Sequence, residues 1–154
     1  MLQNYFINNE TYVFYSSFDN NGFEHSMVIE KEQEFQVKKS PIKIVQESFE
    51  HIGSDYEGAI RGARAILNRR NHIPVVFSAS TEIVLLNFPT IDQLGRVWIV
   101  NKYIYDVRPC EEKTTTIIQM VNGRTIQVGM KFQLVHDRCI QATYLQRIAL
   151  LRHP

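Results

Sequence analysis

The chain has 154 residues and a formal net charge of +1, with 44% hydrophobic and 21% charged residues. This composition excludes intrinsic disorder, because the chain is long enough and apolar enough to bury a core, and it predicts one domain over residues 1–154. No apolar run approaches the roughly 18 residues of a membrane span, and the first ten residues lack the basic and then apolar pattern of a signal peptide. We therefore expect a cytoplasmic protein with no membrane partner, in which Cys110 and Cys139 are reduced thiols.

The charge is divided unevenly along the chain. Residues 1–60 contain four Lys or Arg against ten Asp or Glu, a formal charge of −6, whereas residues 61–154 contain thirteen against six, a charge of +7. Four arginines and no acidic residue lie between Arg61 and His72. A helix dipole favours cations at a helix end, but this density exceeds what the dipole requires. The asymmetry predicts one basic face.

Short alternating runs at the beginning of the chain predict antiparallel strands over residues 11–15, 27–30 and 34–37. Asn20, Asn21 and Gly22 are expected to form the turn between the first two strands. After the break at Pro41, a further short strand is predicted over residues 42–45, leading into a helix.

The strongest helix signal covers about residues 55–70. Ser54 followed by Glu57 fits a capping box, and Pro74 disfavours helix at the preceding residue, so the helix is expected to end near Arg70. Its apolar residues recur at three- and four-residue steps and predict a stripe that faces a core. These residues are Tyr56, Ala59, Ile60, Ala63, Ile66 and Leu67.

Small residues form a separate stripe on this helix, made of Gly58, Gly62 and Ala65. Each glycine costs roughly 1 kcal/mol relative to alanine in a helix interior, so the pair indicates that another backbone comes close. This backbone could be a strand or loop of the same protein, or a nucleic-acid backbone beside Arg61 and Arg64. Gly53, just before the helix, is assigned to the same approach. Either neighbour predicts that Gly62→Leu disrupts folding or function.

The remaining strands are predicted over residues 75–77, 83–88, 97–107, 114–121 and 124–128. The length of the run at 97–107 implies a bend or a bulge. Asn122 and Gly123 predict a hairpin between the last two strands. The chain is therefore expected to be α+β, with mostly antiparallel sheet in about eight short strands, a central helix and a C-terminal helix.

The C-terminal helix is predicted over about residues 137–152, with Asp137 as its N-cap and Arg138, Arg147 and Arg152 outside its apolar stripe. That stripe consists of Ile140, Tyr144, Ile148 and Leu151, and further apolar surface comes from Cys139, Ala142, Leu145, Ala149 and Leu150. So wide a surface predicts a homodimer, in which Leu145→Glu or Leu150→Glu gives a folded monomer. The alternative is that both flanks of the stripe pack on the sheet.

Motifs for catalysis, metal binding and cofactors are absent from the sequence. There is no phosphate-binding loop, dinucleotide fingerprint or nucleophile elbow. His136 and Cys139 lie three residues apart but lack the second pair of ligands that a zinc site needs. Cys110 would need a neighbouring histidine to act as a nucleophile. We therefore expect no catalytic residue, no metal and no cofactor.

Aromatic residues on the predicted strands allow two interpretations. An exposed set would form a base-stacking platform, whereas alternation along the strands places most of them in a core. The core is favoured, and only Tyr103 and Tyr105 are expected to be exposed. The residues concerned are Phe77, Phe88, Trp98, Tyr103 and Tyr105.

The order and spacing of several short segments resemble the ComK family of bacterial competence transcription factors, from about Glu30 to Arg152. These segments are GSDYEG at 53–58, FPT at 88–90, WI at 98–99, NGRT at 122–125 and YLQR at 144–147. The resemblance implies a self-associating activator of transcription that binds paired A·T-rich boxes on double-stranded DNA, largely through the minor groove.

Two departures limit what the resemblance implies. Family members carry a basic residue after the glycine equivalent to Gly58, where this chain has Ala59. They also continue past the position of Pro154 into a tail associated with activation and with capture by a proteolytic adaptor. Adaptor capture is therefore not expected here, and a modulator is open beside an activator.

The basic run and the resemblance together predict a DNA-binding regulator of competence-type genes. The residues assigned to DNA contact are Arg61, Arg64, Asn68, Arg69, Arg70 and His72. The alternative is a protein-interaction module that keeps the fold and has lost DNA binding, and an enzyme is the weakest hypothesis.

Overall fold

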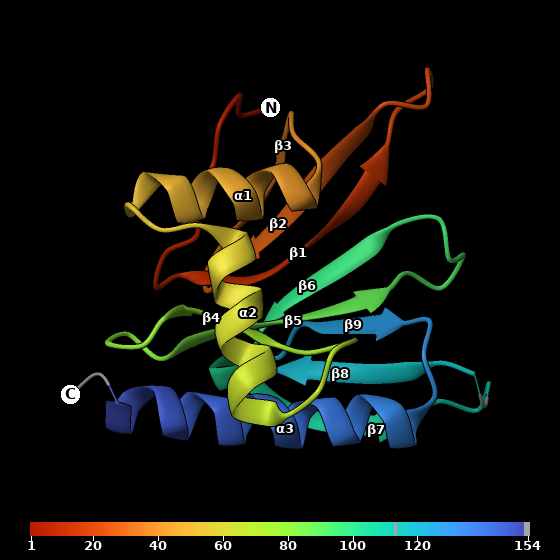
Figure 1. Cartoon of the computed structure of the whole chain (residues 1–154). Coiled ribbons are helices and arrows are strands. Elements are labelled where there is room, and N and C mark those ends of the chain that lie inside the picture. Colours follow the sequence, from red (N-terminus) through yellow and green to blue (C-terminus); the bar gives the residue numbers. More distant parts are fainter. Residues whose placement is uncertain (113, 153–154) are drawn as a thin grey trace.

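The structure is a computed structural model that describes residues 1–112 and 114–152. Within these residues, helices lie against two antiparallel sheets, which confirms the predicted α+β class (Figure 1). The larger sheet contains β1 (Thr11–Phe18), β2 (Glu24–Glu30), β3 (Glu34–Val37), β4 (Val75–Ser78), β5 (Ile83–Pro89) and β6 (Arg96–Val100). Its strand order is β3-β2-β1-β6-β5-β4, so β3 and β4 are its two edges. The smaller sheet contains β7 (Ile104–Pro109), β8 (Thr116–Met120) and β9 (Thr125–Val128).

The long strand predicted at residues 97–107 is divided between the two sheets. Its first part is β6, its second part is β7, and a short 3-10 helix, η1 (Asn101–Tyr103), connects them. The predicted bend is therefore a change of sheet, and this one predicted run supplies two of the nine strands in the described residues. The two predicted turns are confirmed, because Gly22 (φ +82°) and Gly123 (φ +89°) adopt the left-handed conformation that such turns need.

The six-stranded sheet is buried on both faces. Successive residues of a strand point to opposite faces, and neighbours in the central strands enter different cores. One core is covered by α1 (Pro41–His51) and contains Phe14, Leu85 and Trp98. The other is covered by the smaller sheet and α3 (Phe132–Arg152) and contains Val13, Leu86 and Ile99.

Residues 41–51 form helix α1, so the strand predicted at 42–45 is wrong. Ser40 caps the helix, since its hydroxyl accepts a hydrogen bond from the Lys43 amide at 3.4 Å, and Pro41 occupies the first turn. The buried residues recur at helical steps: Pro41, Ile44, Val45, Ser48 and Phe49. The prediction failed because the short apolar run at 42–45 fits either period, and the helical pattern emerges only with Ser48 and Phe49.

The central helix is confirmed as α2 (Tyr56–Leu67), but both of its ends differ from the prediction. Asp55 is the N-cap in place of Ser54, because its carboxylate accepts a hydrogen bond from the Gly58 amide at 2.5 Å. Asn68 ends the helix in the left-handed conformation, with φ at 53°. The helix therefore stops before Arg69 and Arg70, which lie in the connection to β4.

The predicted apolar stripe of α2 packs as expected and joins the two cores. Its first half, with Tyr56, Ala59 and Ile60, contacts the core under α1, and its second half, with Ala63, Ile66 and Leu67, contacts the core under α3. The helix also contacts β4, so it covers one edge of the larger sheet.

The C-terminal helix α3 begins at Phe132, so Asp137 lies inside it and is not its N-cap. The buried face consists of Val135, Ala142, Leu145 and Ala149. Three residues of the predicted stripe instead face outward, with Ile140 56%, Tyr144 51% and Leu151 69% exposed, and Ile148 is half-buried. Leu145 is fully buried, so the structure contradicts the accessible position that the Leu145→Glu prediction assumed. In the described residues, none of the helices combines the length and the apolar content that a bilayer crossing requires.

Candidate nucleic-acid interface

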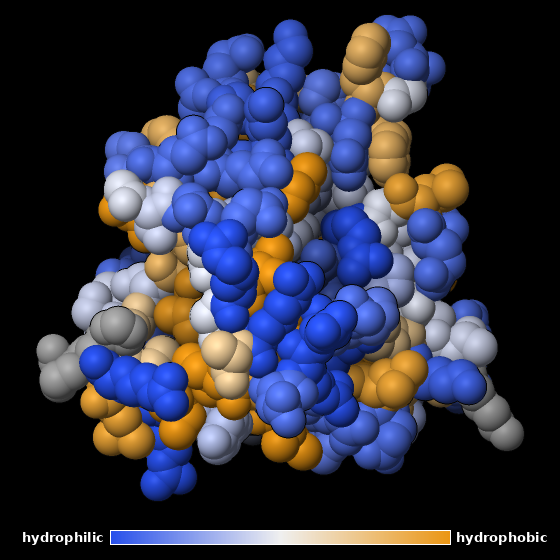
Figure 2. All heavy atoms as spheres, viewed as in Figure 1, coloured by the Kyte–Doolittle hydropathy of each residue, from blue (hydrophilic) through white to orange (hydrophobic). Residues whose placement is uncertain are grey.

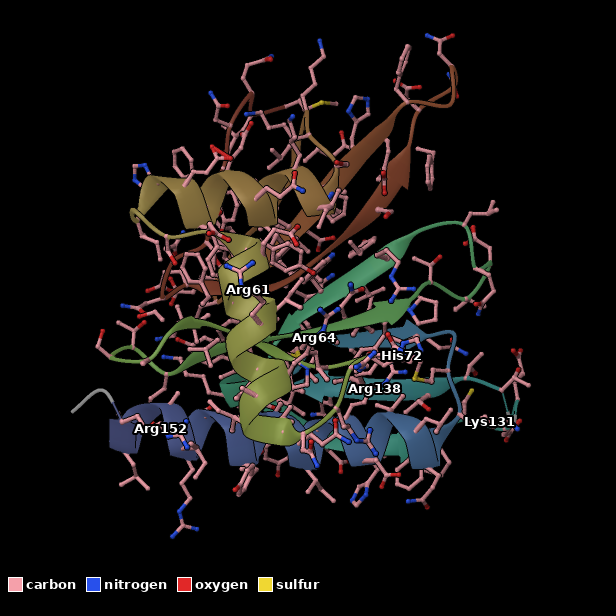
Figure 3. The ribbon with its side chains drawn as sticks, viewed as in Figure 1. Arg61, Arg64, His72, Lys131, Arg138 and Arg152 are labelled. Atoms are coloured by element: carbon pink, nitrogen blue, oxygen red, sulfur yellow. The ribbon has the colours of Figure 1, made fainter. Side chains whose placement is uncertain are left out.

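The residues assigned to DNA lie on α2 and on the connection over residues 68–74. All six side chains are exposed. Figure 2 shows strongly hydrophilic side chains gathered over α2 and the segment that follows it. In Figure 3, Arg64 extends from α2 toward His72 and Arg138, whereas Arg61 lies over the helix itself. The run thus forms one exposed surface from two neighbouring segments.

Backbone geometry fixes the connection after α2. Asn68 has a structural role, because its left-handed conformation ends the helix. His72 also has a positive φ, at 57°. Such a conformation is uncommon for a residue other than glycine and costs about 1–3 kcal/mol, so it persists only where the surrounding structure imposes it. The Arg64 Nε donates a hydrogen bond to the Arg70 carbonyl oxygen at 2.9 Å, which ties the connection back to the helix.

A cavity of about 200 Å³ lies between this connection and the larger sheet. Arg64, Arg70 and His72 border it, together with Arg96 of β6. Its other lining residues are uncharged: Tyr56, Ile60, Asn71, Ile73, Val75 and Asn87. Arg96 was not among the assigned residues, because no sequence pattern places the beginning of β6 beside the end of α2. The structure therefore adds a cation from a distant part of the chain.

Arg138 of α3 extends the basic surface further. Its guanidinium carbon lies 5.9 Å from the centre of the Phe88 ring. Partial burial lowers the pKa of Arg138, and the positive charges of Arg96 and Arg69 lower it further. Guanidinium groups from a strand, a helix and a connection thus lie close enough to repel one another. Such a cluster favours an anionic ligand.

Four arginines of the described structure lie outside the basic surface: Arg108 and Arg124 are paired with carboxylates, and Arg147 and Arg152 on α3 are in no described ion pair. Arg124 pairs with Glu34, and Arg108 lies 3.7 Å from Asp106. Over residues 1–112 and 114–152, no ion pair involves the arginines of the basic surface, which are Arg61, Arg64, Arg69, Arg70, Arg96 and Arg138. Their charges are therefore available to a polyanion.

The small stripe of α2 faces open space instead of another segment of the protein. A Cβ atom added at Gly62 or Gly53 would meet no atom within 4 Å, and one added at Gly58 would touch only the Asp55 carboxylate. The intramolecular explanation for Gly62 is thus removed within the described residues, and with it the reason to expect that Gly62→Leu disrupts folding. The stripe borders an open groove of about 650 Å³ between α2, β4 and the end of α3. Approach by a nucleic-acid backbone stays a prediction.

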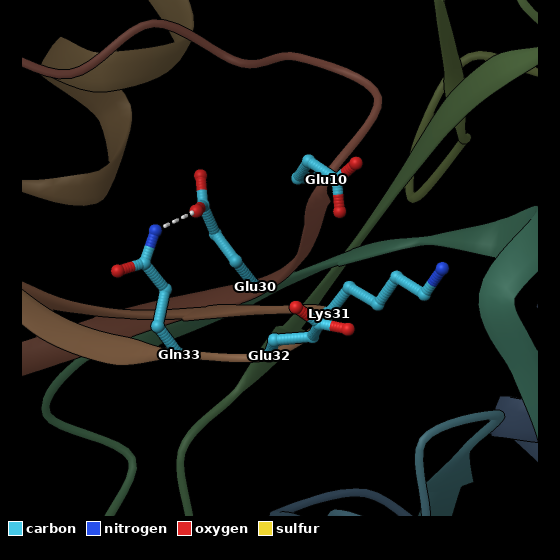
Figure 4. Close-up of a pocket in the computed structure, with 5 residues that line it drawn as sticks. All are labelled: Glu10, Glu30, Lys31, Glu32 and Gln33. Carbon is cyan, nitrogen blue, oxygen red and sulfur yellow. Dashed lines mark hydrogen bonds between the residues drawn. The ribbon is translucent and has the colours of Figure 1, made fainter.

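The β2–β3 end of the larger sheet is acidic. A pocket there is lined by Glu10, Glu30, Lys31, Glu32 and Gln33 (Figure 4). Glu30 is buried, and its carboxylate accepts hydrogen bonds from the Tyr5 hydroxyl at 2.6 Å and from the Gln33 side chain at 2.8 Å. Because β3 and β4 are opposite edges of the sheet, the acidic pocket and the α2 arginines are separated across it. An acidic region therefore lies on the far side of the sheet from the basic surface, where it would repel an anionic ligand.

The core interpretation is confirmed for three aromatic residues, Phe77, Phe88 and Trp98. Tyr105 is exposed, as predicted. The predicted exposure of Tyr103 is wrong, because it is half-buried and its ring stacks on that of Tyr12 with 4.3 Å between the ring centres. The 3-10 helix η1 turns Tyr103 away from the direction that a continuous strand would give it. A base-stacking platform on these strands is therefore excluded.

The two residues considered for metal binding are engaged in packing. The His136 ring stacks on the Phe132 ring, with 5.5 Å between the ring centres. Cys139 is a free thiol whose pKa burial raises to about 11, so it is protonated at neutral pH and is a poor ligand and nucleophile. Cys110 is also a free thiol, as predicted.

Comparisons with known proteins agree with the resemblance seen in the sequence. The family model described as ComK protein matches residues 2–152. A competence transcription factor of Bacillus subtilis (strain 168) is 26% identical over 125 residues. The match covers 79% of this chain and 62% of that protein, so the chain spans less than two thirds of the relative's length. No solved structure matches the chain.

Proposed function

Because the chain belongs to the ComK family, we propose that it is a DNA-binding transcriptional regulator of competence-type genes. The observation that carries the proposal is the basic surface of α2, the 68–74 connection, Arg96 and Arg138, on which no arginine pairs with a described carboxylate. Arginine presents a planar fork of donors that matches phosphate, and phosphate contacts supply much of the affinity of proteins for duplex DNA. In this proposal, residues 1–154 act as one DNA-binding domain in the cytoplasm, without catalysis.

Recognition of A·T-rich boxes through the minor groove is part of the same proposal. A·T-rich segments have a narrow minor groove with enhanced negative potential, which attracts inserted arginines. Arg61 and Arg64 stand nearly one turn apart on α2, while Arg69 and Arg70 stand on the connection after it. This spacing lets some of them contact phosphates while others enter the groove.

A duplex titration tests the proposal. We expect tighter binding to an A·T-rich duplex than to a G·C-rich duplex of equal length, measured at two salt concentrations. Arg61→Ala and Arg64→Ala should weaken binding to both, and each should reduce the salt-dependence slope by about 0.9 if it removes one phosphate contact. The control is Arg124→Ala, because Glu34 already pairs with that charge. Unchanged slopes and affinities in both α2 variants would indicate that the DNA interface lies elsewhere on the protein.

A protein-interaction module is the alternative, and the exposed apolar stripe of α3 favours it. An open groove of about 420 Å³ runs beside the stripe, lined by His136, Cys139, Ile140, Thr143, Tyr144 and Arg147. Figure 2 shows hydrophobic side chains along the lower part of this view, where α3 lies. The titration separates the two functions, since a wild type that binds neither duplex would support the interaction module.

We also propose that the regulator self-associates through this stripe, because paired boxes call for at least a dimer. Tyr144 is 51% exposed at the centre of the stripe, so Tyr144→Glu should give a folded monomer with weaker duplex affinity. Sedimentation at micromolar concentration measures the change, with Gln133→Glu on the first turn of α3 as the control. Sedimentation of the wild type as a monomer, with and without duplex, would refute self-association.

A further inference from the structure

We propose that the cavity bordered by Arg64, Arg70, His72 and Arg96 binds one phosphate group, and that the backbone of the bound duplex supplies it. This inference rests on the DNA binding proposed above. It adds a specific binding site for one phosphate group and a contact residue, Arg96, that lies on β6, outside the arginine-rich segment.

Two guanidinium groups at the cavity are held in position by neutral acceptors. The Arg64 Nε donates to the Arg70 carbonyl oxygen at 2.9 Å, and the Arg96 Nε donates to the Asn87 side-chain oxygen at 2.8 Å. Each bond uses one of the five N–H donors of an arginine and orients the plane of its guanidinium. In the described residues, neither arginine makes a further side-chain hydrogen bond or an ion pair. Their terminal amino groups are therefore oriented and free to form the paired bonds that phosphate accepts.

The charges around the cavity are not neutralised by the protein. None of its lining residues is acidic. Although Arg96 is exposed, neighbouring atoms displace part of the water around its guanidinium and lower its pKa. A phosphate would offset both the repulsion between the arginines and this loss of water, because it carries the opposite charge and accepts several hydrogen bonds. At about 200 Å³, the cavity has room for a single phosphate group.

The surroundings of the cavity favour a polymer over a free ion. Arg61, Arg69 and Arg138 do not line the cavity, but they continue the basic surface beyond it. A single free phosphate would leave these charges unmatched, whereas the neighbouring phosphates of a duplex would meet them. The duplex backbone is therefore the source to which the geometry points.

Thermal unfolding tests the phosphate site without DNA. The wild type is compared in sodium phosphate and in sodium chloride at equal ionic strength. At free phosphate of ten times its Kd, we expect Tm to rise by roughly 3–5 °C. Arg96→Gln should lose this rise, Arg96→Lys should keep only part of it because it retains the charge without the fork, and the control Arg124→Gln should keep it all.

Duplex titration supplies the second arm. Arg96→Gln should reduce the salt-dependence slope by about 0.9 and weaken A·T-rich and G·C-rich binding by the same factor, because a phosphate contact carries no sequence information. A wild type that binds duplex, with no phosphate-specific rise in Tm and an unchanged slope in Arg96→Gln, would overturn this inference and leave the proposed function standing. If the wild type shows a phosphate-specific rise in Tm but binds no duplex, the result would support a binding site for free phosphate and refute the proposed function.

Discussion

Leu145→Glu is expected to unfold the protein. Leu145 is fully buried on the inner face of α3, in the core that also contains Leu86 and Ile118. Truncating a buried leucine to alanine costs roughly 2–5 kcal/mol, and a glutamate adds an unpaired charge whose burial costs several more. Because a domain is stabilised by only about 5–15 kcal/mol, this one change removes most or all of its stability. Circular dichroism with urea titration measures the loss.

The neighbouring residue supplies a matched control. Tyr144→Glu introduces the same charge at a side chain that points outward, so its free energy of unfolding should stay within about 1 kcal/mol of the wild type. A Leu145→Glu protein with native stability would contradict the packing of α3 against the sheets. It would support the role in a protein–protein contact that the sequence pattern suggested for Leu145.

The two stripes of α3 show why a sequence identifies this helix more readily than its orientation. The predicted stripe of Ile140, Tyr144, Ile148 and Leu151 contains only large side chains, which is why the sequence pattern selected it. The buried face includes Ala142 and Ala149, whose small side chains let α3 approach the sheet closely. The choice between these stripes depends on the shape of the sheet beneath, which local periodicity does not contain. The stripe of α2 was predicted correctly because no second apolar stripe competes with it.

The basic surface, likewise, could be predicted only in part from the sequence. The run from Arg61 to His72 could be predicted because its charges are adjacent in the sequence. Arg96 and Arg138 join it only through the order of the strands in the larger sheet and the packing of α3 on β5. Even within the run, the end of α2 depended on the backbone of Asn68, which moved Arg69 and Arg70 off the helix. Contacts between distant segments depend on packing. The cavity that Arg96 borders therefore could not be predicted from the spacing of residues in the sequence.

Gly129→Ala is expected to destabilise the protein by roughly 1–3 kcal/mol, because an added Cβ would clash with the Thr90 carbonyl oxygen and the Gln93 side chain. Gly129 lies between β9 and α3, where its amide donates to the Pro89 carbonyl oxygen at 2.9 Å. The Gln93 Nε2 in turn donates to the Gly129 carbonyl oxygen at 2.8 Å. These bonds hold the segment before α3 against the connection between β5 and β6, so we expect a shift there to displace Arg138 relative to Arg96.

Gly62→Ala is the matched control, because the same added methyl group meets open space on α2. It should leave stability unchanged or raise it by up to about 1 kcal/mol, since alanine favours helix over glycine. Thermal unfolding should therefore shift Tm downward for Gly129→Ala and not for Gly62→Ala, by about 2–4 °C per kcal/mol. Duplex affinity measured below both Tm values should fall for Gly129→Ala, because the basic surface loses the alignment of α3 with β6. An unchanged Tm for Gly129→Ala would mean that the β9–α3 connection accommodates the added methyl group without loss of stability. The relative position of Arg96 and Arg138 would then depend only on the packing of α3 in its core.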